Sequence, residues 1–216
     1  MIYGFSGAHR TGKSTLANAM AKDSDGIFLP INVASVLEKH GVNGVTHQKD
    51  DLETFMRTQS AILDHMESVF RGCEPDLWYW VDRTPLDVLT YTQAYANMAF
   101  FEDTEKANRY YELFNVIKTR CESLLNRYFE GVFLVTAGIP VVPDAKSAVA
   151  HPSCIDHIET LMTGNLCKLS IDNCRRQITK PFYYVVPTDI LDLTQRQVWC
   201  WTIIMENTDV RSDELH

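Results

Sequence analysis

Short apolar runs alternate with longer amphipathic stretches along the chain. The first run, Ile2–Ser6, leads into a glycine-containing turn and then into a helical pattern that begins near Lys13. Runs of the same kind predict further buried strands at residues 27–31, 77–81, 131–136 and Phe182–Val186. Five strands are therefore expected.

Apolar residues recur at helical spacing between these strands. The spacing predicts helices over residues 50–71, 106–129 and 193–206. Thr84 followed by Pro85 is typical of a helix start, with an N-cap and a first helical residue. Strands that alternate with helices favour a parallel sheet covered on both faces. We therefore expect an α/β fold with a doubly wound, mostly parallel five-stranded sheet, in one domain over residues 1–216.

Composition and charge narrow the class of protein. Of the 216 residues, 45% are hydrophobic and 22% are charged, which suits a globular chain with a sizeable core. A net charge of −8 disfavours long nucleic acid as a partner, unless a local basic patch overcomes it. The chain has no run near the roughly 18 apolar residues of a membrane span, no charged leader and no CxxC pair among six cysteines. We therefore expect a cytoplasmic protein with free thiols and no membrane partner, and a homodimer stays open.

The turn after the first strand matches G-x-x-x-x-G-K-[ST], a pattern typical of phosphate-binding loops. Its glycines let backbone N–H groups curl around a polyphosphate, and the following helix N-terminus adds partial positive charge. Lys13 is expected to bridge the β- and γ-phosphates, and the Ser14 hydroxyl to bind Mg²⁺. A glycine turn with a helix cap at Ser14 or Thr15 is the structural alternative. Because a strand and a helix flank the motif, we predict that ATP or GTP is bound by Gly7, Ala8, His9, Arg10, Thr11, Gly12, Lys13, Ser14 and Thr15.

Two charged residues end the strand over residues 77–81. Asp82 and Arg83 follow it directly, where ligands of open α/β sheets bind. Asp82 is expected to bind the metal ion or to accept the proton of an attacking group, and Arg83 to neutralise phosphate charge. A strand-end ion pair is the structural alternative. Beside a phosphate-binding loop we favour the catalytic interpretation for Lys13, Asp82 and Arg83.

These motifs together resemble the P-loop kinases that phosphorylate nucleosides and nucleotides. The closest likeness is to the thymidylate-kinase-like and bacteriophage deoxynucleoside monophosphate kinases, and it rests on residues 7–15, residues 82–87 and Tyr91. It implies that Asp82 and Arg83 lie between the donor and acceptor phosphates. Related nucleoside kinases often carry a carboxylate just after the second strand, but here no acid follows until Glu38. This departure leaves Asp82 as the carboxylate and weakens the nucleoside-kinase version.

One polar residue interrupts the apolar stripe of the helix over residues 50–71. The stripe predicts an apolar residue at position 59, yet Gln59 occupies it. A buried amide costs about 1–3 kcal/mol unless its hydrogen bonds are met, and a nucleobase edge would satisfy both its donor and its acceptor. Similar kinases place a glutamine there, whereas a backbone partner or solvent is the alternative. Arg57 lies off the stripe, so we expect it in solvent or on the phosphate side of the substrate.

The helix after Pro85 carries two further substrate candidates. Asp87 stands three positions after Thr84, as in a capping box, and a contact with the acceptor sugar is its alternative role. Tyr91 follows one helical turn later and either contacts the substrate or packs against neighbouring helices.

A proline-containing segment, residues 137–152, is predicted to form a lid over the phosphates. Kinase lids usually carry arginine, whereas this segment has only Lys146, a point charge without bidentate geometry. Arg175 and Arg176 are the other candidates for the lid cation, with a solvated helix face as their alternative.

The sequence therefore favours ATP- and Mg²⁺-dependent phosphoryl transfer to a small nucleotide acceptor, foremost a deoxynucleoside monophosphate. The alternative enzyme phosphorylates a hydroxyl of a nucleoside or of a modified pyrimidine, free or in DNA, and then Asp82 is the base. The alternative from another class is an ATP-binding switch or assembly module without a small acceptor.

Overall fold

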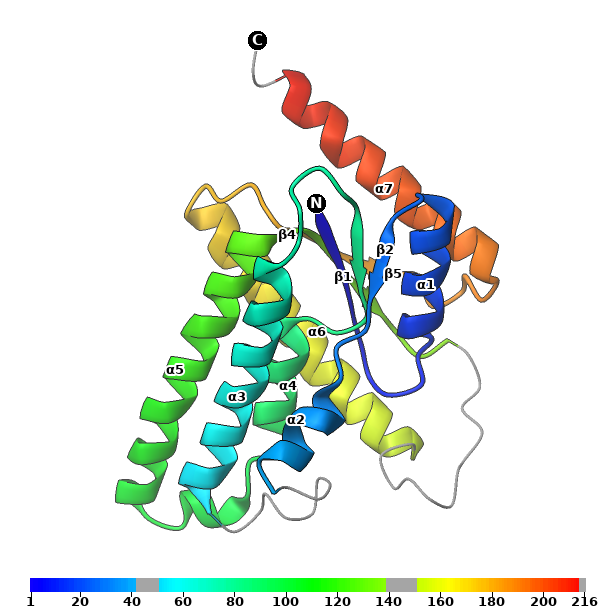
Figure 1. The fold of residues 1–216 in the computed structure, drawn as a ribbon. Coiled ribbons are helices and arrows are strands. Elements are labelled where there is room, and N and C mark those ends of the chain that lie inside the picture. Colours follow the sequence, from blue (N-terminus) through cyan, green and yellow to red (C-terminus); the bar gives the residue numbers. More distant parts are fainter. Residues whose placement is uncertain (42–50, 139–150, 214–216) are drawn as a thin grey trace.

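A five-stranded parallel sheet lies at the centre of the structure, a computed structural model that describes residues 1–41, 51–138 and 151–213 (Figure 1). The strands are β1 (Ile2–Ser6), β2 (Ile27–Leu29), β3 (Tyr79–Val81), β4 (Phe129–Val135) and β5 (Phe182–Val186), in the order β2-β3-β1-β4-β5. Every neighbouring pair is parallel. The predicted doubly wound parallel sheet is confirmed.

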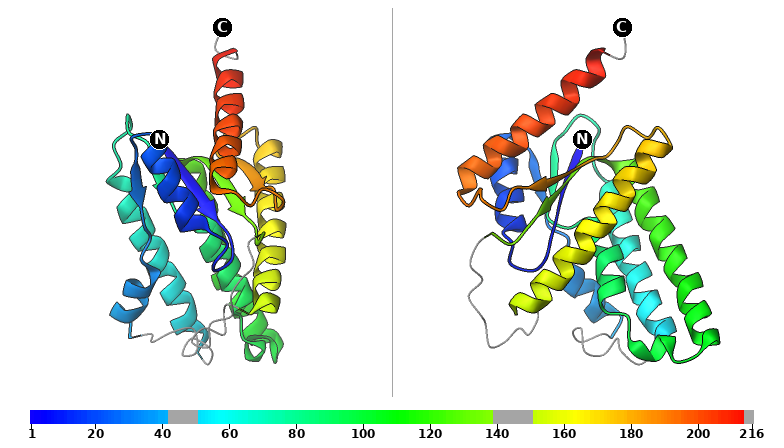
Figure 2. Two further views of the ribbon diagram at one scale, coloured as in Figure 1. Left: turned by 90° about the vertical axis from the view of Figure 1, so that its right-hand side faces the viewer. Right: turned by 180° about the vertical axis from the view of Figure 1, so that it is seen from behind.

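Helices connect the strands and cover both faces of the sheet (Figures 1 and 2). They are α1 (Lys13–Asp23), α2 (Val33–Lys39), α3 (Leu52–Arg71), α4 (Pro85–Ala94), the 3₁₀ turn η2 (Met98–Phe101), α5 (Thr104–Tyr128), α6 (Pro152–Arg175) and α7 (Leu193–Asp213). Helices α1 and α7 lie on one face, and α3 to α6 form the layer on the other. Among the described residues, no helix combines the length and apolar character needed to cross a membrane.

Successive side chains of the central strands enter two different cores. In β3, Val81 packs under α3 to α6, whereas Trp80 packs under α1 and α7. Leu134 and Phe133 of β4 divide in the same way. Because side chains alternate across a strand and both faces are covered, the strands read as continuous apolar runs in the sequence.

The structure adds elements that the sequence pattern did not predict, and it gives the extent of the helix after residue 152. Helix α2 has seven residues, too few to establish a period, and it begins where the Asn32 side chain accepts a hydrogen bond from Ser35 N (3.1 Å). Helix α6 has 24 residues, but buried Asn165 and Asn173 interrupt its apolar stripe. Strand β2 ends before Pro30, which has no N–H to donate to the sheet.

The strand order brings the ends of β1 and β3 together. Gly4 of β1 is in register with Val81 of β3, so the loop after β1 and the residues after β3 emerge side by side. A hydrogen bond of 2.6 Å between Ser6 Oγ and Thr84 Oγ1 joins the two strand ends. This edge of the sheet carries the candidate site.

Candidate active site

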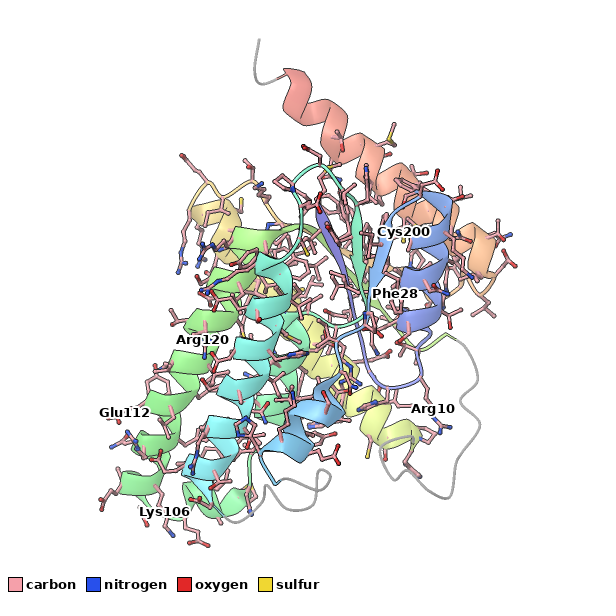
Figure 3. All side chains as sticks on the ribbon, viewed as in Figure 1. Arg10, Phe28, Lys106, Glu112, Arg120 and Cys200 are labelled. Carbon is pink, nitrogen blue, oxygen red and sulfur yellow. The ribbon has the colours of Figure 1, made fainter. Side chains whose placement is uncertain are left out.

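The loop between β1 and α1 has a backbone that requires glycine at two positions. Gly7 has a φ of 153°, and a Cβ there would lie 2.3 Å from the carbonyl oxygen of Val135. Gly12 is the N-cap of α1 with a φ of 92°. Arg10 also has a positive φ, 64°, and its exposed side chain is labelled in Figure 3. Such a curled backbone before a helix N-terminus directs amide groups toward an anion.

Lys13, the first residue of α1, turns its ammonium group into this loop. The ammonium group donates a short hydrogen bond to the carbonyl oxygen of Ala8. Burial lowers the pKa of Lys13 to about 8, against the opposing charge of Asp87, and the nearby Arg83 lowers it further. A partly buried cation with a lowered pKa is stabilised by an incoming anion.

Ser14 and Asp82 meet at the end of β3. Ser14 Oγ donates a hydrogen bond of 2.6 Å to Asp82 Oδ2, and Asp82 Oδ1 accepts one of 3.1 Å from Ile31 N. A hydroxyl and a carboxylate side by side supply the hard oxygen ligands that Mg²⁺ prefers. The donor set therefore fits the predicted metal.

A cavity of about 210 Å³ lies between the P-loop, residues 7–14, and helices α2, α3 and α4. Apolar side chains from these helices form most of its wall. Six residues with polar groups also line it: His9, Gln59, Arg83, Asp87, Tyr91 and Tyr95. A mostly apolar cavity with a few convergent polar groups is typical of a small-molecule site.

Gln59 is buried in the cavity wall, as the broken stripe of α3 predicts. Its side chain is 4% exposed. Thr92 Oγ1 lies 3.4 Å from Gln59 Oε1, but the same hydroxyl donates a shorter bond, 2.7 Å, to the carbonyl oxygen of Val88. A side chain of α4 thus provides a weak contact for this amide oxygen.

Asp87 caps α4 and also faces the cavity. Its Oδ2 accepts a hydrogen bond from Thr84 N (2.9 Å), which completes the predicted capping box of α4. It also lines the cavity and is 3% exposed. Burial raises the pKa of the Asp87 carboxyl, and the Lys13 charge opposes this shift.

Three rings extend from the P-loop along one side of the cavity. The ring of His9 lies 5.4 Å from that of Tyr91, which lies 5.5 Å from that of Tyr95. Burial, followed by the charges of Arg83 and Lys13, lowers the pKa of His9 to about 4, so the imidazole is neutral at neutral pH. The Tyr95 hydroxyl is buried and has no hydrogen-bond partner among the described residues.

Not all predicted site residues lie at the cavity. Arg57 is exposed in a groove between α3 and α5, where its Nη2 donates to Thr54 Oγ1 (3.2 Å). Arg175 and Arg176 lie at the end of α6 away from the P-loop, where Arg175 pairs with Asp172 (3.9 Å). The unpredicted length of α6 separates these arginines from the site, so their position does not suit a lid cation.

Lys146 and most of the predicted lid fall at residues 139–150, outside the described residues.

The structure also brings two unpredicted side chains to the site. Tyr95 lies at the C-terminal end of α4, one turn beyond Tyr91, and this spacing was available in the sequence. Glu159 of α6 accepts a hydrogen bond from the backbone N–H of Ala137 after β4, and its charge acts on Lys13. No sequence feature links Glu159 to the P-loop, because only the packing of α6 brings them together.

Comparison with known proteins adds a family and a fold. A family model described as an AAA domain matches residues 3–146, about two thirds of the chain. None of the curated proteins matches. Two structures of deoxyadenosine kinase from M. mycoides, one with the products dCMP and a flexible dCDP and one with dATP, are 16% identical to the chain, with TM-scores of 0.57 and 0.56. The similar regions cover 95% and 94% of this chain and 99% of each of those chains, which shows a shared fold.

Proposed function

The chain belongs to the AAA-domain family, and we propose that it is an ATP- and Mg²⁺-dependent kinase whose acceptor is a nucleotide, foremost a deoxynucleoside monophosphate. One observation carries the proposal. The cavity has the P-loop residue His9 in its wall, together with Arg83 at the end of β3 and the buried amide of Gln59. An acceptor in this cavity has its base near Gln59 and its reacting end near the P-loop.

In this proposal the residues around the P-loop bind the donor. Backbone amides of the loop and Lys13 hold the triphosphate, and Ser14 with Asp82 holds Mg²⁺, which neutralises charge on the phosphates. Arg83 then stabilises charge on the group in transfer. Catalysis rests mainly on positioning and charge stabilisation.

The engaged carboxylates favour a phosphate over a hydroxyl as the attacking group. Both Asp82 oxygens accept hydrogen bonds, from Ser14 and from Ile31 N, and Asp87 caps α4. The segment after β2, where related nucleoside kinases often have an acid, has none before α2, and its Asn32 caps that helix. A phosphate acceptor is ionised already and needs no base, whereas a hydroxyl does.

The similarity to deoxyadenosine kinase supports a second candidate, phosphorylation of a hydroxyl on a nucleoside. The same chemistry would apply to a hydroxyl on a modified pyrimidine. Asp82 would then have to leave Ser14 and accept the proton. The overall charge of −8 argues against such a hydroxyl within long DNA. An ATP-binding switch without an acceptor leaves the cavity beside the P-loop unexplained.

A transfer assay with labelled ATP tests these candidates. The panel contains deoxynucleoside monophosphates, deoxynucleosides and oligonucleotides, each with Mg²⁺ and with a chelator. We expect Mg²⁺-dependent formation of a deoxynucleoside diphosphate, and none with Lys13→Ala. Transfer to nucleosides alone would establish the second candidate, and ATP hydrolysis that no acceptor stimulates would indicate a switch.

A further inference from the structure

A buried arginine of α7 contacts the P-loop from the side opposite the cavity. Arg196 is 2% exposed and lies in the first turn of α7, one turn before Cys200, which is labelled in Figure 3 on the buried face of the helix. Its Nε donates a hydrogen bond of 2.6 Å to the carbonyl oxygen of Ile190. Its Nη1 donates one of 3.3 Å to the carbonyl oxygen of Thr11.

Neither helix stability nor ion pairing explains why an arginine is buried at position 196. A cation in the first turn of a helix opposes the helix dipole. In the part of the chain that the structure describes, no carboxylate forms an ion pair with its guanidinium group, and Nη2 is buried without a hydrogen-bond partner. A buried charge without an ionic partner is costly, so a compensating role is expected.

The contact with Thr11 controls the direction of a neighbouring amide. The Thr11 carbonyl and the Gly12 N–H belong to one peptide unit, and in a trans peptide they point in opposite directions. Gly12 has a φ of 92°, and glycine tolerates rotation of this peptide plane better than other residues do. A guanidinium group that holds the Thr11 carbonyl outward therefore keeps the Gly12 N–H directed into the loop.

We propose that Arg196 is a positioning residue for the donor nucleotide. It fixes the Thr11–Gly12 peptide so that the Gly12 amide faces the phosphates, and it places behind the loop a positive charge that a bound polyphosphate balances. Through Ile190 it also fastens the segment after β5 to the P-loop. This role rests on the proposed binding of a triphosphate by the P-loop.

The test compares Arg196→Met with Arg175→Met, the same change at an exposed arginine of α6 far from the P-loop. The probes are inorganic tripolyphosphate, which isolates the phosphate contacts, and ATP. For Arg196→Met we expect the Kd of both to rise about tenfold, the equivalent of about 1.4 kcal/mol. The rise in Tm caused by saturating tripolyphosphate should shrink by about 3–6 °C. Arg175→Met removes one positive charge as well, and it should match the parent.

A ligand-induced Tm rise equal to that of the parent, with a lower Tm of the unliganded protein, would make Arg196 purely structural and overturn the proposal. If Arg196→Met does not fold, the Arg196→Gln variant is used for the same Kd measurement, because glutamine keeps a hydrogen-bond donor but is uncharged and too short to contact Thr11. An unchanged Kd for that variant overturns the proposal. Lys13→Ala distinguishes a failure of this proposal from a failure of the proposed function. If the Lys13→Ala protein binds tripolyphosphate as well as the parent does, the assignment of the P-loop as the triphosphate site is wrong.

Discussion

Replacement of Gln59 by leucine tests whether the cavity reads a nucleobase. Gln59 is 4% exposed and interrupts the apolar stripe of α3, so leucine restores the helix pattern at a buried position. Thr92, its neighbour across the interface with α4, keeps its 2.7 Å bond to the carbonyl oxygen of Val88. The substitution therefore removes the amide while it leaves the polar contact within α4 intact.

The expected stability change is small. Loss of a hydrogen bond to the amide costs about 0.5–1.5 kcal/mol, and an apolar side chain in place of a buried amide returns a similar amount. For a chain of this size 1 kcal/mol corresponds to about 2–4 °C. We therefore expect the Tm of Gln59→Leu to lie within about 4 °C of the parent.

The expected loss in catalysis is larger. An acceptor base that gives up one or two hydrogen bonds in a buried site loses about 1.4–2.7 kcal/mol, so kcat/KM for the best acceptor should fall about 10- to 100-fold. Poor acceptors should lose less, which narrows the discrimination among bases. The Kd of ATP should stay unchanged, because the P-loop lies on another segment.

Thermal unfolding and kcat/KM for four deoxynucleoside monophosphates measure both effects. Gln195→Leu, the same change at an exposed position of α7, is the matched control and should match the parent in both. A Gln59→Leu protein that melts more than about 8 °C earlier yet ranks the acceptors as the parent does would refute base recognition by Gln59.

Four further outcomes are expected around the same site. Lys13→Ala should abolish transfer while circular dichroism and Tm show an intact fold. Arg83→Ala should lower kcat by about 30- to 1,000-fold, from about 2–4 kcal/mol of lost transition-state stabilisation, with a much smaller change in the Kd of ATP; equal losses would assign Arg83 to the donor. Tyr95→Phe removes a buried hydroxyl without a described partner, so Tm should hold or rise while the KM of the acceptor rises, and an unchanged KM would exclude a contact. ATP affinity, followed by calorimetry, should fall as pH rises through about 8, where Lys13 loses its proton. Between that pH and its ordinary value of 10.5 the unfolded chain binds more protons, so Lys13 contributes a rise in stability with pH across this window.

Local patterns predicted the parts of the site that depend on a few adjacent residues. The loop after β1 was predictable from its glycines, which adopt backbone conformations that other residues rarely take. The position of Asp82 at the sheet edge was predictable because Asp82 directly follows a buried strand. Gln59 was identified because it is a polar residue at a position where the helical period of α3 predicts an apolar one. These predictions needed only chain neighbours and the parallel sheet.

Features that depend on packing between distant segments were not predictable. Helix α2, which forms one wall of the cavity, has seven residues, fewer than two full helical turns, so its sequence shows no clear period. Glu159 reaches the P-loop region only through the packing of α6. Buried Asn165 bonds Gln93 Oε1 of α4 (2.6 Å), so a polar residue here marks an interface between helices rather than a solvated face. Arg175 and Arg176 are exposed at the end of α6, which fits the solvated helix face that the sequence left open for them. Their distance from the P-loop was not predictable, because the extent of α6 was unknown.

The charge distribution connects these observations. The chain carries a net charge of −8, yet burial, followed by the charges of Arg83, Lys13 and Arg10, lowers the pKa of His9 in the P-loop to about 4. Lys13 itself has a lowered pKa, and Arg196 behind the loop has no ionic partner among the described residues. Such a concentration of cations destabilises the unliganded fold, and a bound polyanion removes that cost. Because the chain as a whole is negatively charged, a long nucleic acid meets more repulsion than a compact polyphosphate that contacts only the P-loop. The same field therefore favours a small nucleotide over a polymer, and binding of that nucleotide should raise the pKa of both Lys13 and His9.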